Sequence, residues 1–221
     1  MSYKRNQIEE AIARISVSNY QKPPSELRTR IKRLLELDRS LGCKLRSKDP
    51  EEANFGFFSE EAPGTGVDIS FSEYDAFALL NALRIMGHSW PQGFAVAIMR
   101  RVRPALEREH ARILKQDPVE LFDQQAIRAA GRPGVIYVDN THPVFLVIAS
   151  KAQRVADEPQ LATSAVCRGL DEVGEFSRRV GASSVSMFEV VTLAHGLHQE
   201  LMKTRPRRRG REGGASSSSG T

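Results

Sequence analysis

Apolar residues recur at helical spacing in the first forty positions. In residues 4–15 they fall three or four apart, which predicts an amphipathic helix. The polar, Pro-containing stretch Ser16–Pro24 predicts a loop. A second helix is predicted from Ser25 to Leu41, with Ser25 as its N-cap and Gly42 as its left-handed terminator. Outside its apolar stripe this helix carries a set of cations: Arg28, Arg30, Lys32, Arg33 and Arg39.

Strict alternation replaces helical spacing around residues 67–71. Val67, Ile69 and Phe71 alternate with polar residues, as in a half-buried strand. Residues 55–59 lie on the other side of a turn-rich Pro/Gly segment. The two segments together predict a β-hairpin.

The segment after this hairpin is apolar nearly all round. Ser72 and Asp75 predict a capping box, with Asp75 in place of the usual Glu or Gln. Because residues 73–86 have almost no polar face, we expect this helix at the centre of the fold. Gly87 should end it, and Ser89 should begin a long helix that kinks or breaks at Pro104.

The second half predicts a short helix, another hairpin and two more helices. The helices are expected at 118–130, 161–180 and 186–203, and the hairpin pairs 135–139 with 144–149. The predicted fold class is mainly α with two short β-hairpins, a winged-helix-like N-terminal half and a helical C-terminal body. The expected regions are a DNA-binding region (1–116), a regulatory or dimerisation region (117–203) and a disordered basic Gly/Ser-rich tail (204–221).

Composition narrows the class of protein. The chain is 40% hydrophobic and 27% charged, which is typical of soluble globular proteins. No stretch approaches the roughly 18 apolar residues of a membrane helix, and the first residues do not resemble a secretory signal. Only Cys43 and Cys167 are present, which disfavours a disulfide framework. We therefore expect a cytoplasmic protein without a membrane partner, associated with the nucleoid if it binds DNA.

The charge is distributed unevenly along the 221 residues. Residues 1–48 hold 12 Lys/Arg and 5 Asp/Glu, a net +7. Residues 49–202 hold 14 and 21, a net −7, and residues 203–221 hold 6 and 1, a net +5. Two basic ends thus flank an acidic middle. Clustered basic charge is the electrostatic pattern of a protein that binds nucleic acid.

A basic helix followed by a hairpin is the arrangement of a winged helix-turn-helix. Such a helix lies in the major groove, where arginine reads guanine and both cations neutralise phosphate. The small residues at the tip of the wing, including Thr65, can approach the sugar-phosphate chain. The predicted DNA contacts are Lys4, Arg5, Arg28, Arg30, Lys32, Arg33, Thr65, Arg207, Arg208 and Arg209.

The segment 71–102 is similar to the two helices that follow the wing in MerR-type regulators. The shared pattern is a serine cap, an acidic first turn, a Leu-rich helix ending near glycine, an aromatic residue and a second apolar helix. Here these positions are Ser72, Glu73, Asp75, Leu79, Leu83, Gly87, Trp90, Val96 and Ile98. The resemblance implies a DNA-binding N-terminal half and a transcriptional regulator. It implies no particular target sequence or effector.

Alternative interpretations of the basic segments stay open at this point. The basic helix could belong to a helical domain and simply face water. The tail could serve only solubility. The whole chain could then be an interaction protein, without catalytic or nucleic-acid function, that uses basic ends for solubility or for an acidic partner.

The sequence favours a protein that is not an enzyme. His195 and His198 are three apart, but a zinc site needs further ligands, and nothing in the spacing ties Glu189 or Cys167 to them. Gly64-Thr65-Gly66 lacks the Gly-Lys-Ser/Thr of a phosphate-binding loop. We expect no catalytic residue, no metal and no cofactor.

An apolar seam runs along the last predicted helix. Its members recur at spacings of three and four: Met187, Val190, Ala194, Leu197 and Leu201. Such an a/d pattern suits helix-on-helix packing. The seam could pack against 161–180 in the same chain, or form a homodimer through residues 186–203.

Overall fold

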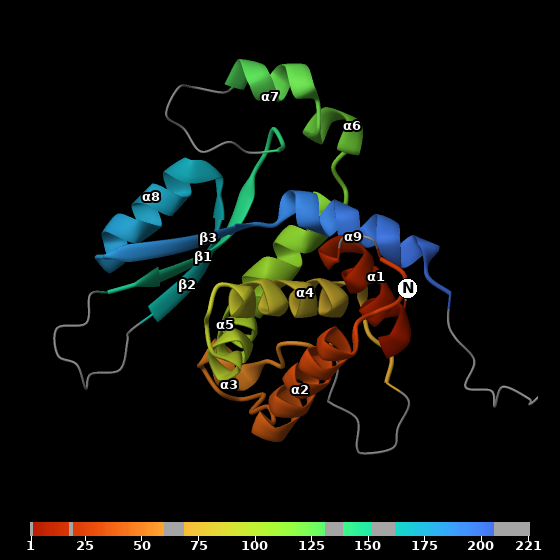
Figure 1. The fold of residues 1–221 in the computed structure, drawn as a ribbon. Helices are drawn as coiled ribbons and strands as arrows, with labels where there is room; N and C mark the ends of the chain where they lie inside the picture. The colour runs from red at the N-terminus through yellow and green to blue at the C-terminus, as the bar shows by residue number, and fades with distance from the viewer. Residues whose placement is uncertain (1, 18–19, 60–68, 131–138, 152–161, 206–221) are drawn as a thin grey trace, which may run out of the picture.

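The computed structural model describes residues 2–17, 20–59, 69–130, 139–151 and 162–205. Within them the protein is mainly helical and contains one small antiparallel sheet (Figure 1). The elements in chain order are α1 (Arg5–Ser16), α2 (Ser25–Leu41), α3 (Pro50–Ala53), α4 (Glu73–Gly87), α5 (Gln92–Ile113), α6 (Pro118–Leu121), α7 (Gln124–Ala130), β1 (Val144–Ser150), β2 (Ala162–Arg168), α8 (Gly169–Val180), β3 (Ser184–Glu189) and α9 (Val191–Lys203).

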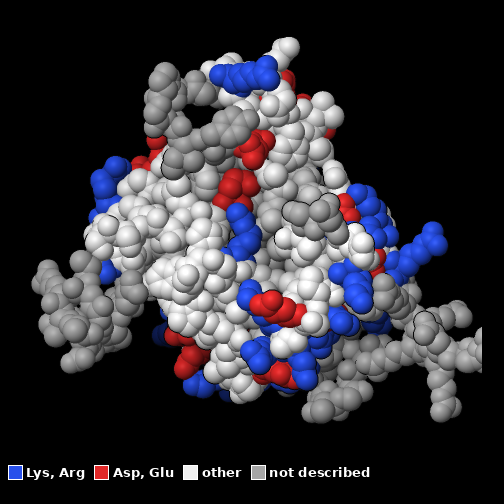
Figure 2. All heavy atoms as spheres, viewed as in Figure 1, with Lys and Arg blue, Asp and Glu red and all other residues white. Residues whose placement is uncertain are grey.

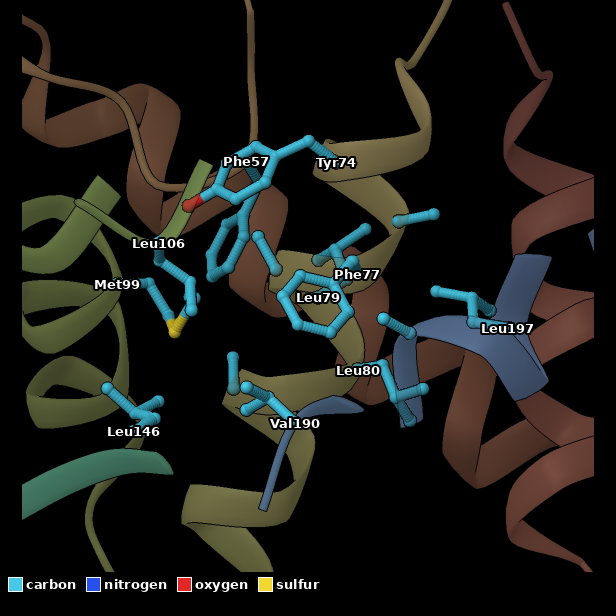
Figure 3. Packing of buried hydrophobic residues seen from close by; sticks show 14 of the residues in the cluster. Phe57, Tyr74, Phe77, Leu79, Leu80, Met99, Leu106, Leu146, Val190 and Leu197 are labelled. Atoms are coloured by element: carbon cyan, nitrogen blue, oxygen red, sulfur yellow. The ribbon is translucent and has the colours of Figure 1, made fainter. Parts of the chain in front are cut away.

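Helix α4 is the centre of the helical body, as its apolar composition predicts. The capping box is confirmed, since the Asp75 amide donates to Ser72 Oγ at 3.1 Å and the Ser72 amide donates to Asp75 Oδ2 at 2.8 Å. Phe77, Leu79 and Leu80 are all buried. Figure 3 shows α4 side chains packed among residues of α5, β1 and α9. A helix covered on every side needs no polar face, which explains its composition.

Helix α5 begins later than its sequence suggests and does not break at its proline. It starts at Gln92 rather than Ser89, and it runs through Pro104 without a break. Proline removes only one backbone hydrogen bond from the ladder. The packing of α5 against α2, α3, α4, α9 and β2 holds the helix together across this position. Residues 118–130, predicted as one helix, form α6 and α7, and Asp123 caps the second of them by accepting from the Gln125 amide at 2.8 Å.

The first predicted hairpin is not formed in the described residues. Residues 55–59 are not a strand, and Phe71 pairs with Tyr3 in an isolated antiparallel bridge. The amides of Gly56 and Phe57 donate to the Asp38 carboxylate at 3.1 and 2.9 Å, so they are not available to a strand partner. Residues 60–68, which include the predicted tip and Thr65, lie outside the described residues.

The second hairpin was predicted with the wrong partner. Strand β1 is the central strand of the order β2-β1-β3 and is antiparallel to both neighbours. Both edges of β1 are therefore occupied by β2 and β3. Of the predicted partner residues 135–139, only Asp139 lies within the described residues. All seven residues of β1 are buried, as expected for a central strand covered on both faces.

The strands β2 and β3 lie where the sequence suggested the starts of helices. Helix 161–180 is replaced by β2 followed by α8, and helix 186–203 by β3 followed by α9. Apolar residues at mixed spacing fit either period in such short segments. Pairing with β1 decides the outcome, because tertiary hydrogen bonding overrides weak local preference.

The sheet joins two apolar layers. Val144, Leu146 and Ile148 of β1 face the helical body and belong to the main core. Phe145 and Val147 face the other way and pack with residues of α8 in a second, smaller cluster. Figure 1 shows α8 covering that face of the sheet.

Helix α9 packs inside the same chain. Val190, Ala194, Leu197 and Leu201 are all buried, and the helix contacts α1, α4 and α5. Met187 lies in β3 and not in a helix. The seam proposed for a homodimer through residues 186–203 is thus already covered, and its main partner is α1 rather than residues 161–180.

Candidate nucleic-acid interface

Helix α2 presents its cations to solvent because its apolar side faces the core. Ile31, Leu34 and Leu35 are buried and bind the helix to the body. The positions between them point outward. Four cations are exposed on this helix: Arg28, Arg30, Lys32 and Arg33.

Two of these cations are paired along the helix. Arg30 Nη2 lies 2.5 Å from Glu26 Oε1, and Lys32 Nζ lies 3.5 Å from Glu36 Oε1. Exposed ion pairs of this kind contribute about 0–1 kcal/mol, so a phosphate group can displace the carboxylate at little cost.

The other two cations are unpaired as far as the described residues go. Within the described residues, neither the Arg28 nor the Arg33 guanidinium makes an ion pair or a hydrogen bond. Both are therefore available to an anion from outside.

The first turn of α1 lies beside the first turn of α2. Arg5 Nη2 donates to the backbone oxygen of Arg28 at 3.1 Å, while Arg5 Nε pairs with Glu9 at 2.7 Å. Lys4 directly precedes α1, and its amide donates to Gln7 Oε1 at 3.0 Å. The structure thus places Arg5 against the start of α2. We call Lys4, Arg5, Arg28, Arg30, Lys32 and Arg33 the basic face.

Figure 2 shows Lys and Arg side chains gathered over the lower right of the molecule, where α1 and α2 lie, with fewer acidic side chains among them. The same view shows a smaller group of cations near α8. The predicted contacts Arg207, Arg208 and Arg209, like Thr65, lie outside the described residues.

A buried ion pair attaches the C-terminal half of α2 to α5 on the buried side of the helix. Asp38 is fully buried and lies 2.6 Å from Arg100 Nε of α5. Arg100 also donates to the backbone oxygens of Asp38, Gly42 and Glu51. These bonds attach α2 to α5, and both charges are compensated, while the outer side of α2 stays exposed.

A second buried arginine of α5 holds the segment that follows α3. Arg103 donates to Asp75 Oδ1 at 3.1 Å and to the backbone oxygen of Phe55 at 3.0 Å, and it lies over the Tyr74 ring at 4.9 Å. Ser59 Oγ donates to Asp75 Oδ2 at 2.8 Å. These bonds give residues 55–59 their loop conformation.

The histidines considered as metal ligands point to different partners. His195 packs edge-on against Phe122 at 5.6 Å, whereas His198 Nδ1 lies 2.7 Å from Glu73 Oε1. Burial lowers the pKa of His195, and nearby His198 lowers it further. Glu189 accepts from the Val191 amide at 2.6 Å at the start of α9, and burial raises its pKa. In the part of the chain that the structure describes, no three His, Cys, Asp or Glu residues form a group able to hold a metal ion.

Sequence reasoning missed an aromatic pair beside the basic face. Trp90 and Phe94 stack with ring centroids 4.5 Å apart and an interplanar angle of 20°. The signal was present, because the two residues are four apart at the start of a helix. From the sequence alone, Trp90 is notable only as part of the pattern shared with MerR-type regulators.

None of the described helices is both long enough and apolar enough to cross a membrane. No protein-family model matches this chain. A search of curated proteins found no relative either. The resemblance to MerR-type regulators therefore depends on the residues of segment 71–102 alone.

Proposed function

We propose that this protein binds DNA through the basic face and acts as a transcriptional regulator. The observation that carries the proposal is the exposed side of α2. There, Arg28 and Arg33 have no partner within the described residues, and the other two cations form ion pairs only with exposed carboxylates.

The density of charge on α2 suits a polyanion. At 1.5 Å per residue, the span from Arg28 to Arg33 covers about 8 Å of helix axis. Duplex DNA carries about four negative charges over the same length. Four cations within this span, with Arg5 beside them, can each neutralise a phosphate and release its counterion.

The proposal depends on a helix face and not on a wing. Residues 55–59 are held in a loop by Asp38 and Arg103, so they do not form one side of a wing. A winged-helix docking would add contacts from Thr65 and its neighbours. The contacts of α2 do not require them.

The test is a salt series with a duplex and two double variants. In Arg28→Glu/Arg33→Glu, both unpartnered cations are reversed at exposed positions, so the fold should be retained. Arg178→Glu/Arg179→Glu makes the same charge change on exposed positions of α8, on the opposite side of the body (Figure 1).

We expect the affinity of wild-type protein for the duplex to fall steeply with salt concentration. The α2 variant should lose affinity at least tenfold and lower the log–log salt slope by about two, one for each lost contact. The α8 variant should stay close to wild type. Equal effects of the two variants would refute the α2 site. If wild-type protein binds neither the duplex nor a single strand, the result would favour the alternative of an interaction protein with basic solubilising ends.

A further inference from the structure

The turn between α4 and α5 forms an aromatic hollow on the surface. It is an open depression of about 420 Å³, lined by His88, Ser89, Trp90, Pro91 and Phe94. The Trp90 and Phe94 rings are both partly exposed. Their stacked arrangement offers a flat apolar wall to a ligand.

The backbone of this turn is held in an uncommon conformation. Ser89 has a φ of +66°, the only positive value of a residue other than glycine within the described residues. A side chain in this region costs on the order of 1 kcal/mol, and such strain is often kept where it positions functional groups. Here it is held on both sides. The Ser89 amide donates to the Met86 oxygen at 3.0 Å, and the His88 ring packs edge-on against Phe188 at 4.9 Å.

The hollow lies next to the basic face. Gln92, two residues after Trp90, donates from Nε2 to the backbone oxygen of Arg33 at 3.1 Å. This bond ties the first turn of α5 to the middle of α2. The hollow at the start of α5 therefore lies beside the part of α2 that carries Arg33.

We propose that the hollow takes an unpaired nucleotide base, so that the preferred ligand is single-stranded nucleic acid. This inference rests on the proposed function, because the basic face must bind the phosphates. In a duplex the bases are stacked inside and cannot reach an aromatic wall. In a single strand each base has a free face, and stacking on an aromatic side chain adds affinity for any sequence.

Trp90 gives a direct readout, because it is the only tryptophan in the chain. The full-length protein is titrated with an oligothymidylate of about 15 nucleotides, within the length scale of one single-strand binding site. A duplex of equal length and heparin, a polyanion without bases, are titrated in parallel. Affinity is measured by calorimetry and stacking by tryptophan fluorescence. We expect the single strand to quench Trp90, and the duplex and heparin to bind without quenching it.

Variants separate stacking from charge. Trp90→Ala should lose about 5-fold to 100-fold in affinity for the single strand and leave heparin affinity unchanged. Trp90→Phe should retain most of the affinity, since it keeps a ring. Phe122→Ala is the control, because Phe122 is a partly buried aromatic residue that follows α6, far from α2 (Figure 1). Circular dichroism shows whether each variant is folded. If Trp90→Ala unfolds, the quenching of wild-type Trp90 by the single strand and its absence with heparin decide the question.

The two proposals fail in different ways. If wild-type protein binds single strand and duplex equally and Trp90 fluorescence does not change, the hollow takes no base. The proposal that the basic face binds nucleic acid would still stand. If neither nucleic acid binds, the proposed function fails as well. Quenching together with loss of single-strand affinity in Trp90→Ala, and not in Phe122→Ala, supports the inference.

Discussion

Replacing Asp38 by alanine should destabilise this protein more than almost any other single change of a polar residue. The carboxylate is fully buried and is bonded by Arg100 Nε at 2.6 Å and by the amides of Gly56 and Phe57. Its removal leaves a guanidinium charge in the interior and two amides without an acceptor. The change therefore loosens the contact between α2, α5 and the segment after α3.

The size of the effect follows from these partners. Removing one member of a buried ion pair costs about 3–5 kcal/mol. An unsatisfied buried amide costs about 1–3 kcal/mol. These costs overlap, since relaxation and water entry relieve all of them together. We expect the free energy of unfolding to fall by about 4 kcal/mol, a large part of the roughly 5–15 kcal/mol of a typical domain.

Urea unfolding measures this loss. With a slope of about 2 kcal/mol per molar urea, the midpoint should fall by about 2 M. Far-UV circular dichroism and Trp90 fluorescence should give the same transition if unfolding has two states. Asp171→Ala is the control, because Asp171 is exposed in the first turn of α8 and should lose only a few tenths of a kcal/mol.

A double variant tests the cause. Asp38→Leu combined with Arg100→Met removes both charges, so it should be more stable than Asp38→Leu alone. If Asp38→Ala unfolds within about 1 kcal/mol of wild type, like the control, the pair does not hold the fold and the reasoning is wrong.

Three further predictions concern the core and the chain end. Burial, with smaller contributions from His198 and His195, lowers the pKa of His110 to about 4. In the unfolded chain a histidine has a pKa near 6.5. The stability contributed by neutral His110 is therefore complete above pH 6.5, and about 3 kcal/mol of it is lost as the pH falls from 6.5 toward 4. His110→Phe should flatten this pH dependence in urea unfolding, and an unchanged slope would contradict the assignment. Leu197→Asp places a charge at a fully buried position of α9 and should unfold the monomer, as seen by circular dichroism, whereas a folded protein with a lower sedimentation coefficient would revive the dimer interface. Deleting residues 206–221 should leave the urea midpoint unchanged. The same deletion should reduce the salt slope of DNA binding by up to about one for each lost phosphate contact. An unaltered slope would remove Arg207, Arg208 and Arg209 from the proposed interface.

The helices of the N-terminal half could be predicted because each carries its own local signals. The extent of α2 follows from its apolar stripe and from Gly42, whose φ of +66° fits a glycine at a helix end. Ser25 is the first residue of the helix and not its N-cap, which is Pro24. The capping box of α4 was likewise local. The exposed cations of α2 followed from the same stripe, since a helix that buries one side must expose the other.

The strands could not be predicted, because the information that decides them is not local. Residues 162–168 become β2 only through pairing with β1. Residues 55–59 become a loop because Asp38 and Arg103 supply bonding partners from distant elements. Likewise, Trp90 and Arg33 are 57 positions apart in the sequence, and only the packing of α5 on α2 brings their surroundings together.

The buried arginines also change the meaning of the charge count. Asp38 is neutralised inside the protein by Arg100, which belongs to the acidic middle segment. Without Asp38, residues 1–48 keep 12 cations against four acids, so their balance rises from +7 to +8. When Arg100 is left out of the count for residues 49–202, their net charge falls from −7 to −8. The charges of Arg103 and Asp75 cancel each other, so leaving out this pair does not change the total. Folding thus sharpens the separation of charge along the chain. It does so by placing two arginines in the core while the cations of α2 stay outside, where a polyanion can reach them.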